Sequence, residues 1–210
     1  MRDISAARLY LVSGAQLTQG SLSDLVPELA AAGVGLIQLR EKDMEAGDLL
    51  SVGEPIRVAC SEAGIPFIVN DRPDVALALE ADGVHLGTND LPTYVARRIM
   101  GGAIVGRSTH SSTDIDEVLG GQDPDYIAVG PVYETPTKPG RPAAGLDLIA
   151  EAAQRVDVPW FAIGGIDEST LPAVLEAGAR RIVVVRAITE SRDPPAAAAR
   201  LRALLDAVSL

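Results

Sequence analysis

The hydrophobic residues of this chain are grouped in eight short runs, and segments with helical spacing lie between them. Each run is continuously apolar, which is typical of a strand that is buried on both faces. The predicted strands are 8–12, 35–40, 67–69, 83–86, 103–106, 126–129, 159–163 and 181–185. Helices are predicted at about 23–33, 44–63, 75–80, from 92, 114–119, from 146, 169–177 and from 194. Buried strands that alternate with helices indicate a parallel sheet whose outer face the helices cover.

Eight repeats of strand and helix, about 20 to 30 residues apart, match an eight-stranded (β/α)8 TIM barrel. A doubly wound open sheet is the rival fold. That fold carries the pattern G-x-G-x-x-G after its first strand, and Val12-Ser-Gly-Ala-Gln does not match it. No segment has the composition of a linker. We therefore expect residues 1–210 to form a single TIM-barrel domain.

Composition and charge narrow the range of partners. The formal net charge of −11 argues against nucleic acid, because phosphate backbones are bound by basic faces. No apolar run approaches the ~20 residues that cross a bilayer, and the N-terminus lacks the apolar stretch of a secretion signal. The single cysteine, Cys60, excludes an intrachain disulfide and is expected to be a small buried side chain in a helix. We expect a cytoplasmic protein with neither nucleic acid nor membrane as partner, and leave open whether it forms a homo-oligomer.

Polar and charged residues cluster at the carboxyl ends of most of the predicted strands and directly after them. In a TIM barrel this is the functional face, because the loops that follow the carboxyl ends of the strands meet there. The residues concerned are Gln38, Arg40, Glu41, Lys42, Asn70, Asp71, Asn89, Asp90, Ser108, His110 and Arg186. The chain has only two lysines, Lys42 and Lys138, and both follow predicted strands. Their placement in an acidic protein indicates a local anion site.

The loop 130–145 is unusually long for a compact repeat of strands and helices, and such loops are usually functional or disordered. It contains four prolines and three glycines, and the prolines lower the entropy cost of ordering it. Thr135, Thr137, Lys138 and Arg141 place hydroxyl groups and cations on one short segment, which suits a phosphate. The alternative is a solvated proline-rich loop.

Asp71 and Asp90 follow adjacent predicted strands and should project into the same mouth. Two carboxylates there could act as an acid–base pair or hold a hard metal ion. Mg²⁺ is commonly held by one or two carboxylates plus substrate phosphates, and the neighbouring cations favour phosphate with Mg²⁺. The structural alternative is that Asp71 caps the third helix and Asp90 the fourth, where Pro92 suits the first turn.

Gly164 and Gly165 follow the seventh predicted strand, where bare backbone N–H groups would let an anion approach, although a tight turn uses the same pair. Arg186, directly after the eighth strand, would add a guanidinium to the same phosphate. His85 lies within a strand and is expected to be a packed, hydrogen-bonded interior residue. His110 could serve the site or bond to a turn. No nucleophile–base pair is evident, so we expect no covalent intermediate.

Taken together, these motifs resemble those of the thiamine-phosphate synthase family. The matching segments follow the same order and span about residues 9–205. They are Gln38-Leu-Arg-Glu-Lys42, Asn70-Asp71, Gly83-Val-His-Leu-Gly87 with Asp90, Ser108-Thr-His110, Thr135-Pro-Thr-Lys138, Ile163-Gly-Gly-Ile166 and Val185-Arg-Ala-Ile188. Gly87-Thr-Asn-Asp90 departs from the usual Gly-Gln-Glu-Asp but keeps the aspartate. Arg107 and Arg186 stand where a small apolar residue and a serine are commoner.

The resemblance implies a transferase that joins a hydroxymethylpyrimidine diphosphate to a thiazole phosphate, releases pyrophosphate and forms thiamine phosphate. It implies Mg²⁺ as the cofactor, with Asp71 and Asp90 as ligands. The pyrimidine diphosphate would be bound by Gln38, Leu39, Arg40, Glu41, Lys42, Asn70, Ser108 and Lys138, among which Arg40, Lys42 and Lys138 would be catalytic. The thiazole phosphate would be bound by Thr135, Pro136, Thr137, Gly165, Val185 and Arg186. Two small phosphorylated substrates are thus the expected partners.

Three other functions are compatible with parts of this pattern. A thiazole tautomerase would share the fold and one ligand, but those relatives carry a histidine where Pro131 stands and tend to lack the Asn70-Asp71 pair. An isomerase or lyase acting on a sugar phosphate should carry a matched acid–base pair at opposing strands. A non-catalytic ligand-binding barrel would not need both carboxylates and both lysines.

Overall fold

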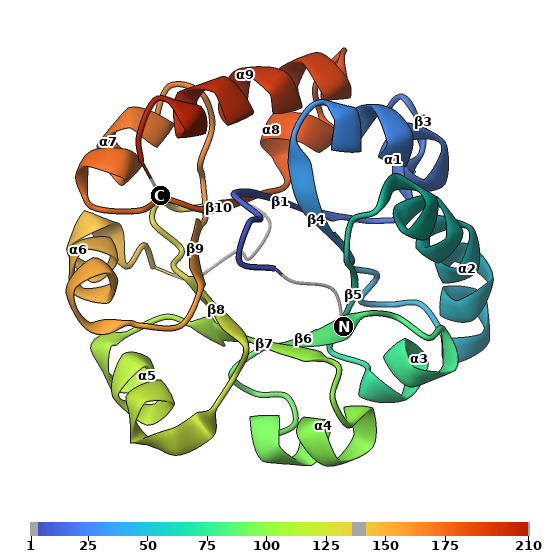
Figure 1. Ribbon diagram of the computed structural model, residues 1–210, viewed down its shortest axis with the longest axis horizontal. Coiled ribbons are helices and arrows are strands. Elements are labelled where there is room, and N and C mark those ends of the chain that lie inside the picture. The colour runs from blue at the N-terminus through green and yellow to red at the C-terminus, as the bar shows by residue number, and fades with distance from the viewer. Residues whose placement is uncertain (1–3, 136–141, 210) are drawn as a thin grey trace.

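In residues 4–135 and 142–209, which the computed structural model describes, eight parallel strands form a closed barrel (Figure 1). The strand order around the barrel is β1, β10, β9, β8, β7, β6, β5 and β4, and β4 pairs with β1 to close it. The strands are β1 (Leu9–Ser13), β4 (Val34–Leu39), β5 (Phe67–Asn70), β6 (Gly83–Leu86), β7 (Ile104–Thr109), β8 (Tyr126–Val129), β9 (Trp160–Ile163) and β10 (Ile182–Val184). They correspond to the predicted apolar runs, and the TIM-barrel fold is confirmed.

Helices lie around the outside of the barrel (Figure 1). They are α1 (Leu22–Ala31), α2 (Ala46–Ala63), α3 (Pro73–Ala78), α4 (Thr93–Met100), α5 (Ser112–Glu117), α6 (Gly145–Arg155), α7 (Leu171–Glu176) and α9 (Pro194–Asp206). Ser21 is the N-cap of α1, because its hydroxyl accepts a hydrogen bond from the Asp24 backbone N–H at 3.3 Å. Over the residues that the structure describes, none of the helices combines the length and apolar character needed to span a membrane.

Three further elements were not predicted. A small antiparallel hairpin, β2 (Gln16–Leu17) with β3 (Gly20–Ser21), follows β1. A short π-helical turn, η1 (Val118–Gln122), extends α5, and α8 (Arg186–Thr189) follows β10 directly. The hairpin strands have two residues each, η1 has five and α8 has four, which is too short for hydrophobic periodicity to indicate them.

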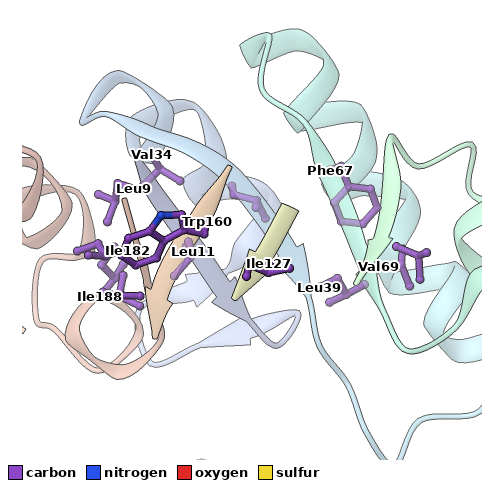
Figure 2. Close-up of a cluster of buried hydrophobic side chains, with 14 of the residues drawn as sticks. Leu9, Leu11, Val34, Leu39, Phe67, Val69, Ile127, Trp160, Ile182 and Ile188 are labelled. Atoms are coloured by element: carbon purple, nitrogen blue, oxygen red, sulfur yellow. The ribbon is translucent and has the colours of Figure 1, made fainter. Parts of the chain in front are cut away.

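The larger hydrophobic core fills the space between the strands and the surrounding helices. Figure 2 labels ten of its side chains: Leu9, Leu11, Val34, Leu39, Phe67, Val69, Ile127, Trp160, Ile182 and Ile188. Cys60 of α2 is fully buried in the same core, as expected. Residues that alternate with these outward-facing positions along each strand point into the barrel.

The inward-facing residues form a smaller second core. Its apolar and aromatic part contains Tyr10, Leu36, Ile68, Ile104, Tyr126, Phe161 and Val183. Ile4 and Ala7, which precede β1, belong to this cluster and close the barrel at the amino ends of the strands. Gln38, His85 and Ser108 are buried inward-facing polar residues nearer the carboxyl ends. The barrel is therefore apolar at its base and polar toward its mouth.

The first and last described segments meet at this base. The Arg8 guanidinium donates from Nε to the Arg180 carbonyl and from Nη1 to the Val208 carbonyl, each at 3.1 Å. The Arg181 side chain donates to the Ser5 carbonyl at 2.9 Å. These bonds attach both segments to the side of the barrel opposite the mouth.

Candidate active site

Two adjoining cavities open at the carboxyl ends of the strands. The larger, of about 460 Å³, is here named the carboxylate cavity, and its lining includes Gln38, Arg40, Lys42, Asn70, Asp71, Asp90 and Ser108. The smaller, of about 280 Å³, is named the glycine cavity, and its lining includes Pro131, Thr135, Gly164, Gly165, Val185 and Arg186. The residues that line both are His110, Ile163, Val183 and Val185. The two cavities therefore form one site with a shared wall.

The carboxyl groups of Asp71 and Asp90 contact each other in the carboxylate cavity. The pKa of Asp71 is raised to about 6, first by burial and then by the hydrogen bond and negative charge of Asp90, while the charge of Lys42 opposes the rise. Asp71 adopts a left-handed backbone conformation with φ of 61°, which aspartate tolerates better than most residues. Two carboxylates this close repel each other unless a proton or a cation lies between them.

Neither aspartate caps a helix, so the structural alternative for this pair is wrong. The residue at the N-cap of α3 is Arg72, that of α4 is Pro92, and neither helix has a side-chain cap. The Asp90 carboxylate instead accepts a hydrogen bond from the Gly87 backbone N–H at 2.7 Å. Both carboxylates therefore belong to the cavity and not to a helix end.

The two carboxylates suit a hard divalent cation. In residues 4–135 and 142–209 there is no group of three or more His, Cys, Asp or Glu side chains that could hold a metal ion by itself. Mg²⁺ is commonly bound by one or two carboxylates, with substrate phosphates and water completing its coordination. Burial and the neighbouring Asp90 carboxyl raise the pKa of Asp71, and a bound cation would favour the ionised form of both groups. The donor set thus fits a Mg²⁺ ion that binds together with a phosphorylated ligand.

Positive side chains lie in the same cavity. Arg40 and Lys42 follow β4, Asn70 ends β5, and all three line the carboxylate cavity. The Arg40 backbone N–H donates to the Ser13 carbonyl at 2.8 Å, which continues the pairing of β4 with β1 past the strand end. The pairing of β4 with β1 thus positions the backbone of Arg40, so that the side chains after β4 enter the cavity that holds the aspartate pair.

Two residues expected to bind the pyrimidine diphosphate turn their side chains elsewhere. Leu39 is 1% exposed and packs in the outer core, and Glu41 accepts a hydrogen bond from the Ala15 backbone N–H at 2.7 Å. A contact between either residue and a ligand would involve backbone atoms, and their roles stay predictions. Four residues of the long loop lie outside the described part of the chain, so their roles also stay predictions: Pro136, Thr137, Lys138 and Arg141.

The backbone of the glycine cavity requires glycine at two positions. Gly164 and Gly165 have φ values of 106° and 66°, in the left-handed region. A Cβ atom on Gly164 would lie 2.5 Å from the Cα of Pro131, and one on Gly165 would lie 2.7 Å from the Cβ of Tyr133. The two glycines thus let the preceding loop pack closely, and because both line the cavity, an anion could approach their backbone.

Arg186 opens α8 and lines the glycine cavity, as expected from its position after the last strand. Its side chain is 45% exposed, and Nη1 lies 3.7 Å from the Glu190 carboxylate. An exposed ion pair of this kind contributes little energy. Arg186 can therefore turn from Glu190 toward an anion at small cost.

The two histidines differ in position. His85 is buried and hydrogen-bonded, as expected, with Nδ1 at 3.1 Å from the Tyr126 hydroxyl and Nε2 at 3.0 Å from the Ser108 hydroxyl. His110 donates from Nδ1 to the Gly130 carbonyl, and its ring also lines both cavities. The sequence left open whether His110 serves the site or bonds to a turn, and did not indicate that it lines both cavities. The available signal was spacing, because His110 follows Ser108 by two residues and so faces the same side.

Fold and site define a (β/α)8-barrel enzyme whose candidate active site has two parts and lies at the carboxyl ends of the strands. The family model described as thiamine monophosphate synthase matches residues 9–188, and the chain belongs to that family. The chain is 51% identical to the thiamine-phosphate synthase of Mycolicibacterium vanbaalenii, covering 98% of this chain and 97% of the relative. It is 49% identical to that of Thermobifida fusca, covering 99% and 96%.

A solved structure agrees with this assignment. The thiamine phosphate pyrophosphorylase from Pyrococcus furiosus matches this structure with a TM-score of 0.86 and 31% identity, over 96% of each chain. The protein described here is therefore a transferase, and the resemblance drawn from its motifs is confirmed.

Proposed function

We propose that this protein joins 4-amino-2-methyl-5-(diphosphooxymethyl)pyrimidine to 5-(2-phosphoethyl)-4-methylthiazole and releases pyrophosphate, forming thiamine phosphate. The carboxylated form of the thiazole is an alternative second substrate, since it keeps the same phosphate and ring nitrogen. The observation that carries the proposal is the pairing of the two cavities. One offers carboxylates and cations, the other offers bare glycine backbone, and they share a wall. A reaction between two phosphorylated rings needs two such neighbouring sites.

The pyrimidine diphosphate is assigned to the carboxylate cavity. Arg40, Lys42 and Asn70 line that cavity and would bind the diphosphate oxygens. Lys138, in the loop after β8, would add a further cation. Mg²⁺, held by the aspartate pair, would supply positive charge that stabilises the departing pyrophosphate. These groups favour bond breaking because negative charge builds on the oxygens that they face.

The thiazole phosphate is assigned to the glycine cavity. The backbone at Gly165 and the guanidinium of Arg186 would bind the phosphate oxygens there. The full set proposed for this substrate is Thr135, Pro136, Thr137, Gly165, Val185 and Arg186. The shared wall then places the thiazole ring beside the pyrimidine ring.

The proposed chemistry needs no protein base. The bond from the methylene carbon to the diphosphate oxygen breaks first, and its electron pair leaves with the pyrophosphate. The 4-amino group donates electron density through the ring to the resulting cation. The thiazole nitrogen then forms the new C–N bond with its own lone pair. This course is consistent with Cys60, the single thiol, being buried in α2 and away from both cavities.

A pyrophosphate-release assay tests the proposal. The protein is supplied with each substrate alone and with both, in the presence and absence of Mg²⁺. We expect release only when both substrates and the metal are present. Release that does not depend on the thiazole phosphate would contradict the proposal.

The same assay separates the rival functions. A thiazole tautomerase would change the thiazole without releasing pyrophosphate. Support for that rival is weaker here because Pro131, which lines the glycine cavity, stands where those relatives carry a histidine. An isomerase or lyase would turn over a sugar phosphate in the absence of both rings.

A further inference from the structure

A chain of buried polar side chains crosses the barrel and borders the carboxylate cavity. The Gln38 side-chain nitrogen donates to the Tyr10 hydroxyl, which lies 2.8 Å from the Tyr126 hydroxyl. Tyr126 lies 3.1 Å from Nδ1 of His85, whose Nε2 lies 3.0 Å from the Ser108 hydroxyl. We name these five side chains the polar relay. It connects two residues, Gln38 and Ser108, that stand on different strands and line the same cavity.

Packing holds the relay in place. Tyr10 and Tyr126 are fully buried, and both meet Phe161 edge to face, with ring centroids 5.4 and 5.7 Å apart. A Cβ atom on Gly106 would lie 2.1 Å from the Tyr126 ring, so this glycine makes room for the phenol. Burial raises the pKa of both tyrosines. Both hydroxyl groups therefore keep their protons at neutral pH.

We assign the direction of the other bonds in the relay from the first. Because the Gln38 amide nitrogen donates to Tyr10, the Tyr10 proton is available for Tyr126. Tyr126 then donates to Nδ1 of His85, so the neutral ring carries its proton on Nε2. That proton is donated to the Ser108 oxygen. The proton of Ser108 is the one left without an acceptor inside the relay.

The two ends of the relay present opposite polarity to the cavity. The carbonyl oxygen of Gln38 has no hydrogen-bond partner in the described part of the chain, so it offers an acceptor. The Ser108 hydroxyl, which already accepts from His85, offers a donor. Each hydroxyl or ring between them accepts one hydrogen bond and donates the next. The orientation of the Gln38 amide therefore determines whether Ser108 offers a donor or an acceptor to the cavity.

We infer that Tyr10, Tyr126 and His85 are positioning residues that fix this polarity, so that the carboxylate cavity selects a 4-aminopyrimidine over its 4-oxo counterpart. The inference rests on the proposed function and names the feature of the substrate that is recognised. An amino group donates to the Gln38 carbonyl, and a ring nitrogen accepts from Ser108. The 4-oxo ring offers an acceptor and a protonated ring nitrogen instead. It matches the relay only if every bond in the relay is reversed.

This selection has a chemical purpose in the proposed reaction. The amino group is the substituent that stabilises the cation formed when the diphosphate leaves. A pyrimidine with an oxo group in its place donates less electron density to the ring. The relay would thus admit the pyrimidine that can ionise and disfavour the one that cannot.

Tyr126→Phe is the variant that tests the relay, because it removes the central hydroxyl and leaves the aromatic ring. The Gln38 amide and the Ser108 hydroxyl can then turn independently. We expect KM for the aminopyrimidine diphosphate to rise about tenfold, with a smaller change in kcat. The ratio of kcat/KM between the amino and 4-oxo substrates should fall about tenfold.

Phe161→Leu is the matched control. It disturbs the same aromatic cluster but removes no hydrogen bond of the relay. We expect it to lower thermal stability and to leave the amino preference unchanged. An equal loss of preference in both variants would mean that packing alone is responsible, and the inference would be overturned.

A spectroscopic measurement tests the relay without turnover. The chain has two histidines, and nitrogen NMR of the free protein reports which ring nitrogen of each carries the proton. We expect the Nε2–H form for His85 and the Nδ1–H form for His110, which donates to the Gly130 carbonyl. The Nδ1–H form at His85 would overturn the assigned direction.

The outcomes also separate this inference from the proposed function. If the wild-type protein releases no pyrophosphate with both substrates, the proposed function is refuted. The inference about the relay then fails with it, because it assumes that a pyrimidine binds in the carboxylate cavity. A wild-type protein that couples both substrates, with an undiminished amino preference in Tyr126→Phe, refutes the relay alone.

Discussion

Asp71 is the residue at which stability and proposed function oppose each other most directly. Its pKa rises from 3.8 to about 6 in the folded protein, with burial as the largest cause and Asp90 as the next. Over that pH range the folded metal-free protein holds a proton that the unfolded chain has released. The free energy of unfolding therefore falls as pH rises through this range. A carboxylate pair that costs stability at neutral pH is retained where a cation is expected to bind.

Asp71→Asn should separate these two effects. Without Mg²⁺, we expect a higher free energy of unfolding than wild type at pH 7.5, and a difference that shrinks toward pH 4. Asparagine tolerates the left-handed backbone of this position. Turnover should fall at least tenfold because a proposed metal ligand is lost. Urea denaturation with a chelator at both pH values, together with the pyrophosphate assay, measures both effects.

Asp74→Asn is the control for that comparison. Asp74 is exposed and paired with Arg72, and the hydrogen bond from Arg72 lowers its pKa. Its removal should give no gain in stability at pH 7.5. An Asp71→Asn protein that is less stable than wild type at pH 7.5 would show that the aspartate pair is not under electrostatic strain.

Lys42→Gln should reduce kcat about a hundredfold, because the proposed charged donor to the leaving group is lost. Lys138→Ala should reduce it at least tenfold for the same reason. Neither change should unfold the protein. Arg57→Gln is the control, since Arg57 pairs with Glu54 on α2 and lines neither cavity. Wild-type turnover by either lysine variant at saturating Mg²⁺ would remove that lysine from the proposed mechanism.

At the scale of elements, the barrel strands were predictable and the short elements were not. Each strand is buried on both faces, so its sequence is mostly apolar, and its polar residues, such as Gln38 and His85, lie toward its carboxyl end. The hairpin β2–β3 and α8 are too short to show a period. The helix-capping alternative for Asp90 was wrong because its carboxylate bonds to Gly87, which sequence spacing does not reveal. The relay was also hidden, because a tyrosine in an apolar run gives no sign of the direction that it faces.

The turn after β9 should be intolerant of side chains. Gly164→Ala would place a Cβ atom 2.5 Å from the Pro131 Cα in a left-handed conformation. We expect a loss of about 2 kcal/mol in the free energy of unfolding and a fall of about 4–8 °C in Tm. KM for the thiazole phosphate should rise as well.

Gly102→Ala is the control for the turn, because a Cβ atom there would meet no atom within 4 Å. It should leave both Tm and KM near wild type. Similar Tm values for the two alanine variants would contradict the steric argument at Gly164.

At the scale of the whole molecule, the residues that stabilise the barrel and the residues proposed to bind substrates lie at different ends of the strands. Its inner core is apolar toward the amino ends of the strands and polar toward the carboxyl ends. Residues at the amino ends of the strands thus stabilise the fold, while residues at the carboxyl ends determine which substrate binds, as is general for TIM barrels.

Ile4→Ala tests this separation. Ile4 is 6% exposed and closes the inner core, so its truncation should lower the free energy of unfolding by about 2–3 kcal/mol. KM values should stay near wild type, because the cavities lie at the other end. Leu119→Ala, at a position 48% exposed, should change stability by less than about 0.5 kcal/mol. A large rise in either KM for Ile4→Ala would mean that base and mouth are coupled.

The hydrogen bonds that join Arg8 to the Val208 carbonyl, and Arg181 to the Ser5 carbonyl, have a practical consequence. A surface, a dye or a second enzyme linked to the protein close to Ser5 or Val208 would be held on the far side from the open cavities. Immobilised in this way, the catalyst would face the solution, and both small molecules could enter unobstructed.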